Sequence, residues 1–136
     1  MNSVLFPALL AGPIIRRLDT SQVYIWVAMS KEYSITADVY LVNTIDGTEK
    51  YSKINSITNT QTIQFGKNLF IHLIQITPTI NQFPTNEFIG YNLHFENQEE
   101  SFDLGKLGLL THSNEKSIVY DSFKYPTFFY RKRTRS

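Results

Sequence analysis

Apolar and polar residues alternate with a period of two along much of this chain, which is the pattern of β-strands. The strongest case is the stretch of residues 23–29, which holds the only Trp of the sequence. One face of this stretch carries Val23, Ile25 and Val27, and the other carries Tyr24, Trp26 and Ala28. Because both faces are largely apolar, we expect a strand that is covered on both sides. Trp has the largest apolar area to bury, so the other strands are expected to pack around it.

The same pattern predicts strands in seven further parts of the chain. They are residues 9–18, residues 34–42, one or two short strands within residues 50–65, and then residues 69–76, 88–95, 118–120 and 127–130. The stretch of residues 69–76 resembles residues 23–29 in being apolar on both faces. Residues 104–110 are the one place where a helical turn fits, although their glycines weaken it.

Turn signals separate these stretches. Pro13 has no amide proton to donate, so it marks the first strand as an edge or bulged strand. Asp46-Gly47 predicts a hairpin turn, because Gly accepts a positive φ without a Cβ clash. Asn55 and Asn59-Thr60 are two alternative places for a break in the middle segment, and residues 66–68 predict a further turn.

Seven to nine short strands, with no amphipathic helix of twelve residues or more, predict an all-β fold. The spacing of the turns favours an antiparallel β-sandwich of immunoglobulin or fibronectin type III character. A closed barrel is the alternative. With 136 residues the chain is long enough for one core. We expect one sandwich domain over residues 1–130, and a basic tail or the start of an interdomain linker over residues 131–136.

Composition excludes several classes of function. Thirteen Lys and Arg stand against twelve Asp and Glu, so overall charge makes no case for a nucleic-acid partner. The basic tail holds four of the positive charges, and a short terminal run of this kind is typically a solvated end. The chain has no Cys, which excludes disulfides and thiolate metal sites and fits a reducing compartment.

The apolar N-terminus superficially resembles a signal peptide. It lacks a basic leading region, contains Pro7, and runs directly into strand-like sequence, so we expect the first strand of the mature protein instead. The chain has no apolar run of about 18 residues, so no membrane-spanning segment is expected. These features together predict a cytoplasmic location.

Few residues suggest chemistry. His72 and His94 lie on strands that could be neighbours, which would allow a shared metal site, but two imidazoles without a third ligand make a poor one. The remaining histidine is His112. None of Ser3, Ser21 and Ser30 has the sequence context of a nucleophile. Asp46-Gly47 lacks the ladder of oxygen ligands of a calcium loop. The sequence therefore predicts no catalytic, cofactor-binding or metal-binding residue in this chain.

Two groups of residues are candidates for contact with another domain or partner. Arg16 and Arg17 are neighbours on a strand, so they are expected to point to opposite faces, one toward solvent and one toward the core edge or a partner. The C-terminal segment is dense in aromatic residues: Tyr120, Phe123, Tyr125, Phe128, Phe129 and Tyr130. Alternate residues of one strand can pack in the core and form an apolar docking patch, so both roles fit this segment. The candidates for contact are Arg16, Arg17, Tyr125, Phe128, Phe129 and Tyr130.

Four blocks of the sequence, in this order, resemble one known family. In the first, Leu10-Ala11-Gly12-Pro13-Ile14-Ile15-Arg16-Arg17 leads into residues 23–28, where the pattern is Val-x-Ile-Trp-Val. The other three blocks are residues 69–76, residues 83–93, and residues 118–120 with residues 125–129. Together they resemble the N-terminal domain of PhoD-like phosphatases, the alkaline phosphatase D type of metallophosphoesterases. The resemblance covers most of the chain, from about Leu10 to Phe129.

This resemblance implies an accessory role. In the family, a small β-sandwich precedes a catalytic domain in which carboxylates, histidines and an asparagine hold two metal ions. The metal-binding signature needs Asp-x-His, Gly-Asp-x-x-Asp and Gly-Asn-His/Asp steps, and this chain has no Asp-x-His, Gly-Asp or Gly-Asn. The implied function is a non-catalytic domain that packs against a C-terminal metallophosphoesterase domain in the same polypeptide and shapes access to it. Metals are expected only in that domain.

The alternative is a stand-alone immunoglobulin-like module that binds a protein or carbohydrate. An exposed apolar patch in the C-terminal segment would favour the accessory domain. A polar surface with a concave, aromatic-lined loop end would favour the module. A small enzyme in its own right has no supporting residues.

Overall fold

The structure is a computed structural model, and it describes residues 6–79, 82–110, 117–119 and 123–131, with Arg17 and Leu18 by their backbone alone. Within these residues nine strands and no helix form the fold. The strands are β1 (Leu9–Asp19), β2 (Gln22–Met29), β3 (Ser34–Ile45), β4 (Thr48–Ile54), β5 (Ser56–Gln64), β6 (Phe70–Pro78), β7 (Phe88–Glu96), β8 (Ser101–Asp103) and β9 (Thr127–Phe129).

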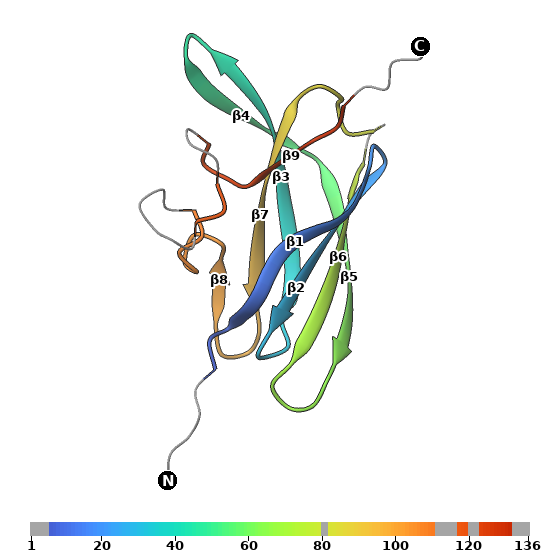
Figure 1. The fold of residues 1–136 in the computed structure, drawn as a ribbon, viewed down its shortest axis with the longest axis vertical. Coiled ribbons are helices and arrows are strands. Elements are labelled where there is room, and N and C mark those ends of the chain that lie inside the picture. Colours follow the sequence, from blue (N-terminus) through green and yellow to red (C-terminus); the bar gives the residue numbers. More distant parts are fainter. Residues whose placement is uncertain (1–5, 80–81, 111–116, 120–122, 132–136) are drawn as a thin grey trace.

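The strands form two sheets, and neighbouring strands in each run antiparallel (Figure 1). Sheet A has the order β1-β2-β6-β5. Sheet B has the order β4-β3-β7-β8, and β9 also pairs with β7. The predicted antiparallel β-sandwich is therefore confirmed, and the alternative of a closed barrel is wrong.

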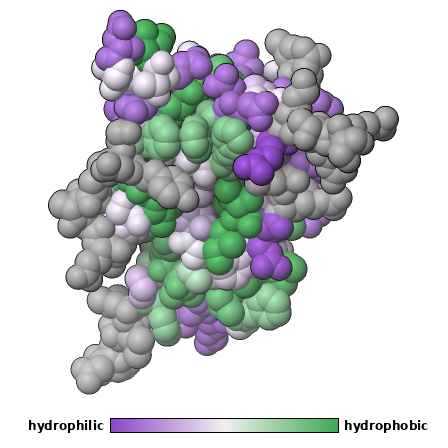
Figure 2. Space-filling view, turned by 45° about the horizontal axis from the view of Figure 1, so that its top comes forward, coloured by the Kyte–Doolittle hydropathy of each residue, from purple (hydrophilic) through white to green (hydrophobic). Residues whose placement is uncertain are grey.

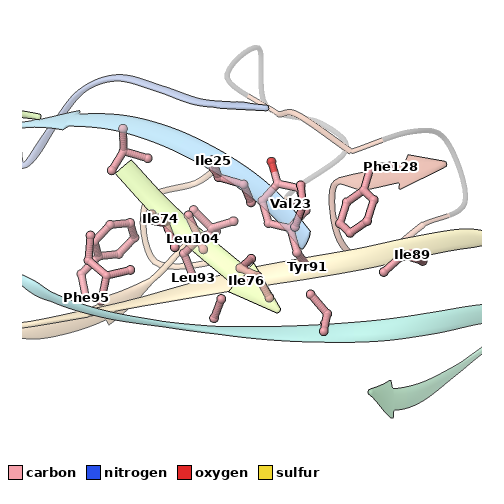
Figure 3. Close-up of a cluster of buried hydrophobic side chains, with 14 of the residues drawn as sticks. Val23, Ile25, Ile74, Ile76, Ile89, Tyr91, Leu93, Phe95, Leu104 and Phe128 are labelled. Atoms are coloured by element: carbon pink, nitrogen blue, oxygen red, sulfur yellow. The ribbon is translucent and has the colours of Figure 1, made fainter. Parts of the chain in front are cut away.

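The core lies between the two sheets. In Figure 3 the labelled side chains of β2 and β6 point toward those of β7, with Leu104 and Phe128 among them. The period-two pattern explains this arrangement, because odd-numbered residues of β2 and β7 and even-numbered residues of β6 all face inward. The largest fully buried apolar side chains are Phe83, Phe95, Ile25, Met29, Ile74, Ile76, Ile89, Leu93 and Leu104.

One prediction for β2 is wrong. Its inner residues are buried as expected, but Tyr24 and Trp26, on the outer face of sheet A, are only partly buried. The core lies between the two sheets, so the outer face of sheet A, which carries Tyr24 and Trp26, is turned away from it. The Trp therefore lies on the outside of sheet A, and the core is not built around it.

Most turn predictions are confirmed. Asp46 and Gly47 have φ values of 52° and 76° and join β3 to β4, which is the geometry that a tight hairpin requires. The middle segment breaks at Asn55, between β4 and β5. The alternative break at Asn59-Thr60 is wrong, because β5 pairs with β6 along its whole length and this ladder outweighs the weak strand propensity of Asn.

The first strand is also as predicted. β1 is an edge strand of sheet A, and its pairing with β2 shifts register at three points between Leu9 and Arg17. Pro13 lies within this irregular part. Because the pairing is not regular there, the missing N–H of Pro13 interrupts no regular ladder of hydrogen bonds.

Residues 104–110 form successive turns, with Leu107 N–H donating to Asp103 O at 3.3 Å and Gly108 N–H to Gly105 O at 3.0 Å. The first of these bonds joins residues four apart, as in one helical turn, so the predicted helical turn is confirmed. The strand predicted over residues 118–120 is wrong for the two of its residues that the structure describes. Ile118 and Val119 are not in a strand; the Ile118 N–H donates to Leu109 O at 2.9 Å. The third residue of that predicted strand, Tyr120, lies outside the described residues.

The edge of sheet B beside β7 is made of two pieces. β8 pairs with one end of β7 and β9 with the other, and the chain leaves the edge between them. Asn92 fills the interruption: its Oδ1 accepts the Leu104 N–H at 3.3 Å, and its Nδ2 donates to Asp103 Oδ2 at 3.2 Å. The Tyr91 N–H donates to Pro126 O at 3.0 Å, so the backbone of β7 stays paired where neither strand reaches it.

Candidate functional site

The aromatic residues of the C-terminal segment are divided between the core and the surface. Phe128 is 4% exposed and packs edge-on against Phe83, with ring centroids 5.6 Å apart. Tyr130 is also buried, and its hydroxyl donates to Gln22 O at 3.2 Å. Phe129, between them, is 39% exposed. Alternation along β9 and the residue after it thus places two candidate contact residues inside and one outside.

Phe129 belongs to a small group of phenylalanines on the surface of sheet B. It lies directly opposite Phe88 across the β7–β9 pair, with ring centroids 5.1 Å apart. Phe88 is 42% exposed and also packs against Phe123 at 5.2 Å. We call Phe88, Phe123 and Phe129 the phenylalanine surface. Figure 2, in which the top of the sandwich is turned forward, shows hydrophobic residues reaching the surface between hydrophilic ones.

Tyr125 has a structural role that the sequence did not indicate. Its ring stacks on Tyr40 with centroids 4.9 Å apart and meets Tyr51 edge-on at 5.6 Å. It also covers Gly90, where an added Cβ would be 3.3 Å from the Tyr125 Cβ. Burial, with a smaller contribution from Tyr125, raises the pKa of Tyr40 to about 12. Tyr125 therefore fixes the C-terminal segment on the outer face of sheet B.

The arginine pair lies on the irregular edge strand β1. Arg16 is exposed. The backbone of Arg17 pairs opposite Tyr24, and its side chain is outside the described part of the structure. Opposite orientations for the two side chains therefore stay a prediction.

The structure separates the histidines that could have shared a metal. His72 is on β6 and faces the interior of the sandwich, whereas His94 is on β7 in the other sheet and faces outward. A shared site is therefore wrong, because the two strands belong to different sheets. The third, His112, lies outside the described residues. Within the described part of the chain, no group of three or more His, Asp or Glu residues could hold a metal ion.

His94 belongs to a polar network on the outer face of sheet B. Its Nε2 lies 2.9 Å from Asp38 Oδ2, and Asp38 Oδ1 lies 3.3 Å from Lys53 Nζ. Asp103 lies nearby: burial tends to raise its pKa, but hydrogen bonds from the Lys106 amide and Asn92, with the charge of His94, lower it overall. Exposed ion pairs of this kind contribute little to stability.

Of the three serines considered as nucleophiles, Ser21 and Ser30 are described, and both make structural hydrogen bonds. The Ser21 hydroxyl donates to Asp19 Oδ1 at 2.6 Å within the β1–β2 turn. The N–H of buried Ser30 donates to Ala8 O at 2.9 Å. Ser3 lies outside the described residues.

Three shallow hollows, none of which includes the phenylalanine surface, lie in the described part of the chain. The first of these three, about 400 Å³, is at the opposite end of the sandwich and is lined mainly by acidic and amide side chains. Its lining residues are Glu32, Tyr33, Ser34, Glu96, Asn97, Gln98 and Glu99. A second hollow, of about 310 Å³, lies between the start of β1 and the turns of residues 104–110. No helix in the described residues is long and apolar enough to cross a membrane.

Sequence reasoning missed Phe88 as a partner of Phe129. The signal was present, because Ile89 and Tyr91 face the core and Phe88 must then face outward. What the sequence could not supply is the register that sets Phe88 opposite Phe129.

Comparison with known proteins gives no relative. No family model matches the chain, and neither the curated proteins nor the solved structures contain a significant match. The resemblance to PhoD-like phosphatases therefore depends on the four sequence blocks alone and stays a prediction.

Proposed function

We propose that this chain is a non-catalytic β-sandwich domain of the immunoglobulin type that binds a partner protein domain through the phenylalanine surface. The strand order supports the type: β1-β2-β6-β5 and β4-β3-β7-β9 follow the order A-B-E-D and C′-C-F-G of immunoglobulin-like sandwiches. The split edge strand, formed by β8 and β9, is the main departure from that arrangement.

The exposed pair Phe88 and Phe129 is the observation that carries the proposal. Fully burying one such ring stabilises a protein by about 1.5–3 kcal/mol, and these two lie side by side and partly open to water. Aromatic side chains and Arg are enriched at protein interfaces, and the exposed Arg131 follows in the same segment. A partner with a complementary apolar surface would bury the parts of the Phe88 and Phe129 rings that are exposed in this chain, and this burial would stabilise the complex.

The position of the surface favours an accessory domain over a free-standing module. Phe123 and Phe129 belong to the C-terminal segment, where a following domain of the same polypeptide would dock. The hollow of about 400 Å³ at the opposite end is lined mainly by acidic and amide groups, which fits poorly with an aromatic-lined carbohydrate site. A PhoD-like metallophosphoesterase domain is the narrower version of this partner, and its support is the four sequence blocks.

Site-specific photo-cross-linking tests the surface. A photoreactive phenylalanine analogue is placed at position 129 or 88 of the natural protein in its source cells. We expect one specific cross-linked product, within a longer polypeptide or to a second protein. Phe65 is the matched control, because it is an exposed phenylalanine in the β5–β6 turn at the opposite end of the sandwich (Figure 1). Absence of a product at both 88 and 129, or the same product at 65, contradicts the proposal.

The reading frame tests the narrower version. We expect the gene to continue past Ser136 into the Asp-x-His and Gly-Asp-x-x-Asp steps of a metallophosphoesterase. A stop codon after Ser136 would exclude the accessory domain and leave the stand-alone module.

A further inference from the structure

Three of the four sheet edges carry features that discourage pairing with another chain, and the edge formed by β5 does not. β1 has Pro13, the exposed Arg16 and an irregular register. β4 carries Glu49, Lys50 and Lys53, and the remaining edge consists of the three-residue strands β8 and β9. Proline, charge, bulges and short length are the usual protections of an edge strand. β5 has nine residues without charge, Pro or Gly.

The sequence of β5 reads almost the same in both directions. Around Thr60 it runs Ser-Ile-Thr-Asn-Thr-Gln-Thr-Ile-Gln, so each residue has a chemically similar counterpart at equal distance on the other side. Ile57 matches Ile63, Thr58 matches Thr62, and the amide Asn59 matches the amide Gln61. An antiparallel pair of identical strands centred on Thr60 would therefore place like against like. Such self-complementarity is what a two-fold symmetric interface requires.

The backbone of β5 is oriented for this pairing. Thr79 N–H donates to Asn55 O at 2.9 Å at one end, and Phe65 N–H donates to Leu69 O at 2.8 Å at the other. Odd-numbered residues of this segment therefore bond toward β6, since hydrogen-bonded pairs alternate along an antiparallel ladder. Even-numbered residues, with Thr60 in the centre, direct their N–H and C=O groups away from β6. Near Thr58 this side of β5 lies close to β3, because the Ala37 N–H donates to Thr58 Oγ1 at 3.0 Å, so among the described residues the backbone groups of β5 are unpaired here but the edge is not remote from sheet B. Figure 1 shows this edge at the right border of the molecule.

The side chains of β5 also fit a second copy. Ile57 is 53% exposed and Ile63 is 56% exposed, both on the outer face of sheet A. In the symmetric register, Ile57 of one copy would lie opposite Ile63 of the other, and aliphatic pairs of this kind stabilise neighbouring strands. Leu73 and Ile71 continue this apolar surface on β6.

We propose that two copies of this chain associate through β5, in antiparallel register about Thr60, and join their A sheets into one continuous sheet. The pairing would form about ten backbone hydrogen bonds between the copies. The joined sheet would end on both sides at β1, whose Pro13 and Arg16 oppose the addition of a further strand. The assembly is thus a closed dimer, and it leaves the phenylalanine surface on sheet B free.

Sedimentation equilibrium of the complete chain measures this association. We expect a reversible monomer–dimer equilibrium in the micromolar range. The double substitution Ile57→Lys with Ile63→Lys places like charges opposite each other and should raise the dissociation constant about tenfold or more. The double substitution Ile57→Lys with Ile63→Glu places opposite charges together in the same register and should restore association. Both side chains are exposed, so circular dichroism of the variants should match the original chain.

A cysteine cross-link fixes the register. The chain has no cysteine, so Thr60→Cys introduces the only thiol. In the proposed dimer the two Cα atoms at position 60 lie about 5.5 Å apart, within disulfide range, and mild oxidation should give a covalent dimer. In the control Gln64→Cys the two Cα atoms are roughly 26 Å apart, and no dimer should form.

Each of three results would overturn the proposal. The first is a chain that stays monomeric up to about 0.5 mM, which is well above the micromolar range. This result would overturn the proposal even if a different protein were found to pair with β5. The second is equal association of the Lys/Lys and Lys/Glu variants. The third is equal cross-linking at positions 60 and 64.

Discussion

Gly12 lies so close to Trp26 that a Cβ atom added to it would be 2.7 Å from the Trp26 carbonyl oxygen. The backbone of β1 therefore approaches β2 more closely than any residue with a side chain allows. Gly12 also has a φ of +96°, a conformation that other residues rarely adopt. Two independent reasons thus require glycine at this position.

Gly12→Ala should lower the free energy of unfolding by about 2 kcal/mol or more, because it combines a backbone clash with strain at positive φ. Urea unfolding monitored by Trp26 fluorescence measures the change. Gly66→Ala is the matched control: its φ is +75°, but an added Cβ has nothing within 4 Å. The control should lose only about 1 kcal/mol. Equal losses in the two variants would show that the contact with Trp26 does not matter.

His72 should make the stability of the chain depend on pH. It is buried, its Nδ1 lies 2.8 Å from Thr62 Oγ1, and its Nε2 has no hydrogen-bond partner among the described residues. Burial lowers the pKa of His72 below 6.5, opposed more weakly by the backbone of Lys31 and the charge of Glu32. The unfolded state therefore binds the proton more readily. The free energy of unfolding is therefore highest, as far as His72 is concerned, above pH 6.5, and it decreases as the pH falls below 6.5.

His72→Leu removes both the titrating ring and the unpartnered nitrogen. We expect it to raise the free energy of unfolding by about 1 kcal/mol at pH 7. Between pH 7 and pH 5 the original chain should lose stability faster than the variant. Because His94 and His112 are present in both proteins, the difference between the two curves isolates His72. Parallel curves would mean that His72 is not held neutral by burial.

How far the fold follows from sequence depends on the range of the interactions involved. The inner face of β2 and the Asp46-Gly47 turn are fixed by local pattern and local backbone geometry, and both predictions are confirmed. The exposure of Trp26 depends on whether a third layer covers sheet A, which no local pattern reports. β8 has three residues, too few to show a period of two, and it exists because a turn at Asn97 returns the chain to β7.

The candidate site shows the same division. Alternation along the last strand predicts that Phe128 and Phe129 point in opposite directions, and the structure places them so. The partner Phe88 needs the register between two strands far apart in the sequence. Likewise, the symmetry of β5 can be read directly from its residues, but only the strand order shows that it forms an edge.

Asn92 should be essential for closing the split edge of sheet B. Asn92→Ala removes the acceptor of the buried Leu104 N–H, which is left unpaired, and one of the donors to the Asp103 carboxylate, which keeps the Lys106 N–H. We expect a loss of about 2 kcal/mol in urea unfolding. Asn59→Ala, at an exposed amide on β5, is the control and should change stability by less than about 0.5 kcal/mol. A similarly small effect at Asn92 would show that solvent replaces its bonds.

The isolated chain should have no metal-dependent phosphatase or phosphodiesterase activity. Its described residues bring no group of three metal-ligating side chains together, and its sequence lacks the Asp-x-His and Gly-Asp-x-x-Asp steps. Hydrolysis of a chromogenic phosphomonoester and phosphodiester is measured with added Mn²⁺, Zn²⁺ or Ca²⁺. Turnover above background that EDTA abolishes would contradict the non-catalytic assignment.

Phe128 and Phe129 should differ sharply when each is truncated. Phe128→Ala empties a site among Phe83, Tyr91 and Tyr130 and should cost about 3–5 kcal/mol of stability. Phe129→Ala removes a partly exposed ring whose described aromatic neighbour is Phe88, and should cost less than about 1 kcal/mol.

The same pair of variants separates structure from binding. If the phenylalanine surface serves a partner, Phe129→Ala should weaken cross-linking at position 88 while circular dichroism and the unfolding midpoint stay close to those of the original chain. A large loss of stability for Phe129→Ala would instead make its ring part of the fold. The exposed phenylalanines would then need no partner to explain them.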